Sequence, residues 1–103
     1  MKYIMLAHSS ENMDRFMPII FPDELTHAIV AAIMLCSPEL EGFAVRSAGS
    51  IQLGGTIMGK HFPTICDGWS ETLNLQSHPE DAKIISLYEY GGKFGQFLPG
   101  LPA

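Results

Sequence analysis

The sequence predicts an α+β fold: a compact single domain of β-β-α-β-β-α order, with an antiparallel sheet and two helices. A chain of 103 residues has the size of one hydrophobic core. Short apolar or alternating segments at 2–7, 16–21, 43–53 and 69–76 are typical of strands. Helical spacing of apolar residues appears over 25–36 and 78–90. We therefore expect a domain at 1–90, followed by a Gly/Pro-rich apolar C-terminal tail at 91–103.

The first two predicted strands are expected at different places in the sheet. Residues 2–7 are almost wholly apolar, which favours a strand buried on both faces. The polar residues 8–15 indicate a loop. In the second strand, Pro18 has no amide to donate to a ladder, so residues 16–21 are expected at a sheet edge or a bulge.

The first helix is predicted to begin after Asp23, whose carboxylate can cap it, and to end at Ser37 and Pro38. The core stripe at helical spacing comprises Leu25, Ala28, Ile29, Ala32, Ile33 and Cys36. The opposite face, with Val30, Ala31 and Met34, is apolar too. A helix of this kind is buried nearly all round, so we expect either another subunit or the C-terminal tail to cover the face that carries Val30, Ala31 and Met34.

The middle of the chain is rich in glycine. Residues 42–54 fit either two strands at a tight turn or one strand bent at a bulge. A loop with a short strand at 64–66 follows. Residues 69–76 then alternate, with Glu71 on the apolar side, where we expect it to lie at a strand end or to pair with an arginine, for which Arg46 is available.

The second helix has the clearest local signal. Ser77 and Glu80 have the spacing of a capping box, which predicts a helix over 78–90 that ends at Gly91. Its expected inner stripe is Ile84, Leu87 and Tyr88.

Composition excludes several classes of protein. The chain is 47% apolar and only 17% charged, against about 25% charged residues in an average domain. Its six bases are scattered along a chain of net charge −5, which argues against direct nucleic-acid binding. The longest apolar run, residues 28–36, is too short for a membrane span. The N-terminus lacks a secretory core and the two cysteines read as reduced thiols, so we expect a cytoplasmic protein.

No catalytic or cofactor motif is supported by its context. Residues 54–60 have the spacing of a phosphate loop, but His61 and Pro63 stand where Ser or Thr and a helix are needed. The histidines and cysteines lack the close spacing of zinc ligands. We therefore predict no metal, no cofactor and no enzymatic activity. A weaker alternative is an enzyme or small-ligand site at Glu71, His61 and Cys66.

Three surfaces are candidates for partner binding. Six of the eleven acids lie within the first 41 residues and could face a basic groove on a partner. The other two surfaces are apolar: the face of the first helix that carries Val30, Ala31 and Met34, and the C-terminal tail. The predicted partner-binding residues are Glu11, Asp14, Asp23, Glu24, Val30, Met34, Phe94, Phe97 and Leu98.

Three segments, 18–27, 47–49 and 70–81, together resemble small uncharacterised accessory proteins of tailed bacteriophages and prophages over residues 2–90. The resemblance implies expression in the cytoplasm of an infected bacterium. By analogy with small acidic phage proteins, we expect a non-enzymatic inhibitor of a host protein, an anti-CRISPR or other anti-defence factor. The alternative is a self-associating structural or assembly component of the phage, which would be a homo-oligomer.

Overall fold

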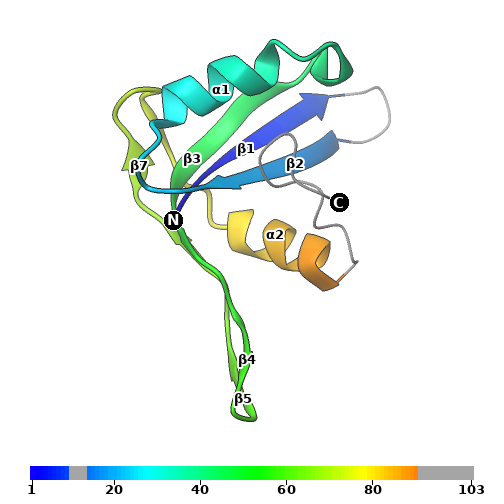
Figure 1. Cartoon of the computed structure of the whole chain (residues 1–103). Helices are drawn as coiled ribbons and strands as arrows, with labels where there is room; N and C mark the ends of the chain where they lie inside the picture. Colours follow the sequence, from blue (N-terminus) through cyan, green and yellow to red (C-terminus); the bar gives the residue numbers. More distant parts are fainter. Residues whose placement is uncertain (10–13, 91–103) are drawn as a thin grey trace.

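The centre of the protein is a four-stranded antiparallel sheet of order β2-β1-β3-β6 (Figure 1). The computed structural model describes residues 1–9 and 14–90. The strands are β1 (Lys2–Ser9), β2 (Asp14–Phe21), β3 (Ala44–Gln52) and β6 (Ile65–Asp67). In β1, residues 3–6 are fully buried, because helices cover both faces of the sheet. This confirms the expectation from its apolar run.

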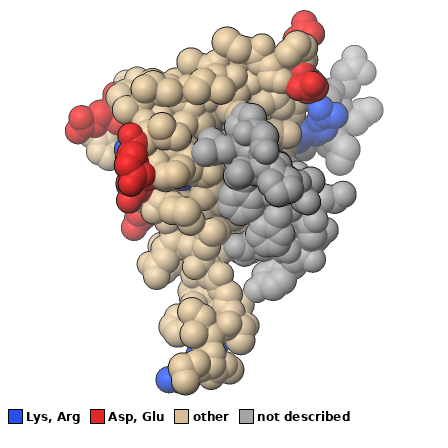
Figure 2. Space-filling model, viewed as in Figure 1, with Lys and Arg blue, Asp and Glu red and all other residues tan. Residues whose placement is uncertain are grey.

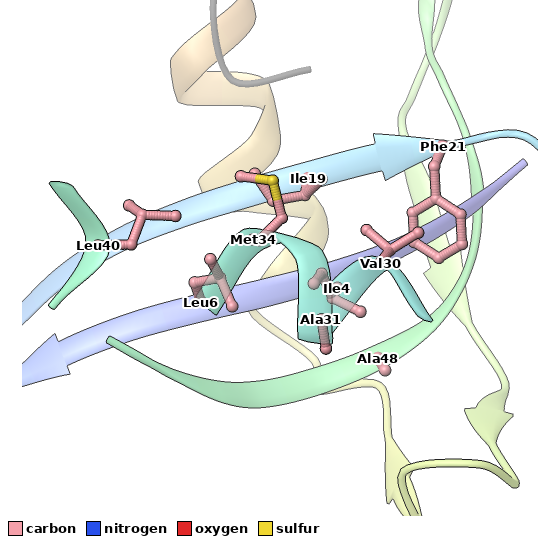
Figure 3. Close-up of a cluster of buried hydrophobic side chains, with 9 residues drawn as sticks. All are labelled: Ile4, Leu6, Ile19, Phe21, Val30, Ala31, Met34, Leu40 and Ala48. Atoms are coloured by element: carbon pink, nitrogen blue, oxygen red, sulfur yellow. The ribbon is translucent and has the colours of Figure 1, made fainter. Parts of the chain in front are cut away.

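Helix α1 (His27–Leu35) covers one face of the sheet. Val30, Ala31 and Met34 point from the helix towards Ile4 and other sheet residues (Figure 3). The predicted orientation of this helix was wrong: Val30, Ala31 and Met34 are buried, whereas the predicted core residues Ile29, Ala32, Ile33 and Cys36 are exposed. The start was also misplaced. Thr26, not Asp23, is the N-cap, and its side chain accepts a hydrogen bond from the Ile29 amide at 3.2 Å.

Helix α2 (Asp81–Tyr90) covers the opposite face. Among its described apolar side chains, Ile85 is fully buried and joins a second cluster with Tyr3, Met5, Ile20 and Ile51. The predicted inner stripe was therefore partly wrong: Ile84 is half-buried, Leu87 is exposed, and the side chain of Tyr88 lies outside the described residues.

Strand β2 lies at the edge of the sheet, as the position of Pro18 predicts. Strand β3 is one continuous strand with a bulge, which decides between the two alternatives for residues 42–54. Met5 lies opposite Ser47 and Leu6 opposite Val45, so Arg46 is the extra residue. The bulge places Arg46 and Ser47 together on the side of α2.

Two hairpins that the sequence did not predict interrupt the chain between β3 and α2. The first comprises β4 (Gly55–Ile57) and β5 (Lys60–Phe62) and projects from the body, away from α1 (Figure 1). We call residues 54–64 the arm. The second comprises β7 (Trp69–Ser70) and β8 (Leu75–Gln76), and a turn of residues 71–74 joins its strands. A single 3-10 turn, η1 (Pro38–Leu40), follows α1.

The described part of the chain is an α+β domain with antiparallel sheets and two α-helices, as predicted. The expected short strand at 64–66 is present as β6, one residue further on. The order of elements is more elaborate than expected, because of the two hairpins. None of the described helices is long and apolar enough to cross a membrane.

Candidate functional site

The structure separates the predicted partner-binding residues. Val30 and Met34 of α1 are buried against the sheet. Asp23 and Glu24 are exposed, and Asp23 pairs with the N-terminal ammonium at 3.3 Å. Asp14 begins β2. Glu11, Phe94, Phe97 and Leu98 lie outside the described residues.

The residues of the weaker alternative, an enzyme or small-ligand site at Glu71, His61 and Cys66, lie on three different elements. Glu71 is exposed in the turn between β7 and β8, and the partner of Arg46 is Glu80 rather than Glu71. Cys66 is half-buried in β6, where burial first and the Asp81 carboxylate second raise the pKa of its thiol to about 12. At neutral pH this thiol is protonated and therefore a poor nucleophile. His61 lies on the exposed arm.

A shallow pocket of about 310 Å³ lies between the arm and the first turns of α2. Its described lining includes His61 and Phe62 from the arm and Lys83 and Ser86 from the helix, but neither Glu71 nor Cys66. Both of its titratable side chains are exposed. Within residues 1–9 and 14–90, moreover, no cluster of three or more His, Cys, Asp or Glu side chains could hold a metal ion.

Asp81 is the centre of a buried polar network that sequence reasoning missed. Its carboxylate is fully buried, and one oxygen accepts hydrogen bonds from the Tyr3 hydroxyl at 2.5 Å and the Ser47 hydroxyl at 2.7 Å. The backbone amide of His78 donates to the same oxygen at 3.0 Å. Burial, together with the hydrogen bond to Asp81, raises the pKa of Tyr3 far above its usual value. These contacts tie α2 to the centre of the sheet.

The predicted capping box is thus shifted by one residue. The side chain of Asp81, rather than that of Glu80, reaches back to a backbone amide, and the amide is that of His78 rather than Ser77. Glu80 instead forms an ion pair with Arg46, whose guanidinium carbon lies 4.7 Å from the centre of the Phe16 ring. Two neighbouring contacts therefore join the bulge to the start of α2: Arg46 pairs with Glu80, and Ser47 donates to Asp81. This arrangement is structural: it docks the helix.

The arm has the most unusual surface of the described residues. Ile57 is 64% exposed, Met58 97% and Phe62 47%, although all three have large apolar side chains. Their exposure follows from the hairpin's position, because the arm contributes no residue to either buried cluster.

The tip of the arm is a two-residue turn between Ile57 and Lys60. Met58 and Gly59 both have positive φ, +52° and +79°, as a type I′ turn requires. Asn or Asp is preferred at the first of these positions because its short polar side chain tolerates the left-handed conformation. A methionine here is unfavourable for the backbone and leaves an apolar side chain in water.

The base of the arm is tightly held. The Gly54 amide donates to the Thr64 hydroxyl at 3.0 Å. A Cβ atom at Gly54 would lie 2.2 Å from the Phe62 carbonyl oxygen, so only glycine fits where the two strands cross. The sequence signal for the arm was the glycine-rich stretch 54–59, which we interpreted as a loop.

The arm also differs from the body in charge. Lys60 is the only Lys, Arg, Asp or Glu in residues 54–64, while the whole chain carries a net charge of −5. In the view of Figure 2, red acidic atoms lie over the body and none over the arm. Comparisons with protein-family models, curated proteins and solved structures find no match.

Proposed function

We propose that this chain is a non-enzymatic binding protein that docks on a partner protein through the arm. The observation that carries the proposal is Met58, an apolar side chain 97% exposed at the tip of a hairpin, in a backbone conformation that disfavours methionine. Neither folding nor solubility explains this residue. A contact with a partner does, because burying a methionine side chain contributes about 1.5–3 kcal/mol.

The surroundings of Met58 support the same role. Ile57 and Phe62 extend the exposed apolar surface along the arm, and methionine and aromatic side chains are enriched in the centres of protein interfaces. The close crossing at Gly54 fixes the base of the arm, so less conformational entropy is lost when the arm binds.

The finer proposal concerns the partner in a cell. The resemblance to phage accessory proteins supports a host protein as the target, with inhibition, anti-CRISPR or other anti-defence action, in the cytoplasm of an infected bacterium. The exposed acids Asp23, Glu24, Glu39, Glu41 and Glu71 would steer such an association towards a basic surface. The buried Val30 and Met34 take no part in it.

The variant Met58→Asn tests the proposal, because it removes the apolar anchor while supplying the residue that the turn prefers. We expect stability to be unchanged or to rise by up to about 1 kcal/mol. Tagged wild-type protein should retain a stoichiometric partner from bacterial lysate, and the variant should lose it.

Leu87→Gln is the matched control, since Leu87 is 65% exposed on α2 and its replacement removes a comparable apolar side chain far from the tip of the arm. The control should capture the partner as the wild type does. Equal capture by Met58→Asn and wild type, or no partner for the wild type, would refute docking of a host protein through the arm.

A further inference from the structure

The structure describes a second apolar surface that could receive an arm. We propose that the arm of one copy docks on the outer face of α1 of a second copy, so that the chain forms a dimer with two equivalent contacts. This proposal rests on the proposed function of the arm and commits the partner to a second copy of this chain.

The outer face of α1 is uncovered by the described residues. Ile29 is 51% exposed and Ile33, one helical turn later, is 59% exposed. Ala32, Leu35 and Cys36 extend this surface towards the end of the helix. The apolar side chains of the arm are suited to contact this apolar helix face. If the arm and the helix face covered each other, most of the exposed large aliphatic side chains described above would be buried.

Charge makes the two surfaces complementary. Residues 22–45, which contain α1, carry the acids Asp23, Glu24, Glu39 and Glu41 and no Lys or Arg. The last turn of α1 has no basic residue to balance the negative end of its dipole. Lys60, beside the arm tip, would bring a positive charge to this mostly acidic segment.

The acids at the two ends of α1 are not equally available. Asp23 already pairs with the N-terminal ammonium, and Ser37 donates a hydrogen bond to Glu39 at 2.5 Å, which leaves the carboxylate charge of Glu39 in place. Arg15 lies over the ring of Phe43, two residues after Glu41, with its guanidinium carbon 5.6 Å from the ring centre. Glu39 and Glu41 are therefore the acids that we assign to Lys60.

The occupant must come from another copy because the arm projects away from α1 of its own chain (Figure 1). A two-fold axis lets each copy give its arm and receive the other's, and such a contact closes at two subunits. The same two surfaces without a two-fold axis would produce open chains, which the experiment below also distinguishes.

Sedimentation velocity of the full chain over a concentration series tests the proposal. The wild type should sediment as a dimer of the 11.3 kDa chain that dissociates on dilution. Met58→Asn on the arm and Ile33→Lys on α1 should each weaken dimerisation by at least about tenfold, because each removes an apolar contact that occurs twice. Leu87→Gln should remain dimeric.

Exchanging the charges of Lys60 and of Glu39 and Glu41 adds a second test, because misfolded variants would not regain dimerisation when they are combined. Lys60→Glu alone, and Glu39→Lys with Glu41→Lys, should each weaken the dimer. The combination of all three should restore it, because the opposite charges are exchanged between the two surfaces. Thermal unfolding of every variant checks that the fold is retained.

The outcomes separate this proposal from the proposed function. A wild-type monomer at the highest soluble concentration, an open-ended series of oligomers, or a dimer insensitive to Ile33→Lys would overturn the arm-to-helix contact. If such a protein still captures a host partner in a Met58-dependent manner, the arm remains a docking element and only its second-copy partner is wrong.

Discussion

At the scale of single residues, the structure depends on a few polar groups placed in unusual environments. Asp81 is the clearest case: a fully buried carboxylate accepts hydrogen bonds from a strand hydroxyl, a bulge hydroxyl and a backbone amide. The hydrogen bonds to one oxygen offset part of the solvation that this carboxylate loses, while its other oxygen is buried without a hydrogen-bond partner among the described residues. Tyr3, Ser47 and Asp81 thus connect three segments that are distant in sequence.

Replacing Asp81 with Asn should destabilise the protein by about 2 kcal/mol, since three hydrogen bonds to a carboxylate oxygen become weaker hydrogen bonds to a neutral amide oxygen. The neighbouring Glu80→Gln removes only an ion pair whose acid is half-exposed, so it should cost less than about 1 kcal/mol. Urea unfolding at neutral pH measures both. Equal losses for the two variants would show that Asp81 does not hold α2 on the sheet.

At the scale of elements, α1 shows where sequence reasoning succeeds and where it fails. Its existence and its end at Ser37 and Pro38 were predictable, but its orientation was not. Residues 28–36 are all apolar, so the periodicity has no polar face to mark the outside. The adjacent polar residue, His27, is misleading because it is buried, with its ring nitrogen 2.9 Å from the Gly49 carbonyl oxygen.

Similar causes explain the other corrections. The alternation over 69–76 predicted one strand, whereas a turn with Asn74 at positive φ divides it and leaves Glu71 in solvent. The arm escaped prediction because Met58-Gly59 lacks the Asn-Gly signal of a type I′ turn. The edge position of β2 and the double burial of β1 were predictable because proline and an unbroken apolar run each have one dominant structural cause.

The orientation of α1 predicts a contrast between neighbouring residues. Met34→Ala should cost about 2–3 kcal/mol, because the side chain is buried against the sheet and leaves a cavity. Ile33→Ala should change the stability of the isolated chain by less than about 0.5 kcal/mol, because its side chain faces away from the core. Chemical denaturation at a concentration low enough to keep the chain monomeric measures the two values. The reverse ranking would restore the orientation that the sequence suggested.

At the scale of the whole molecule, the chain divides into a folded body and a projecting arm. The body buries β1 between two helices and contains both hydrophobic clusters, whereas the arm places its apolar side chains in solvent. This division accounts for part of the low charge fraction: of the ten large apolar side chains that are exposed in the described residues, six lie on the arm and on the outer face of α1. Both belong to docking surfaces in the proposals above.

Removing the arm tests this division most directly. In the variant, residues 55–62 are replaced by two glycines between Gly54 and Pro63, so that both hydrophobic clusters stay intact. Thermal unfolding and sedimentation velocity are then measured on the same samples. We predict a melting temperature close to that of the wild type, with complete loss of association. Retained association at an unchanged melting temperature would contradict the claim that the arm is the docking element.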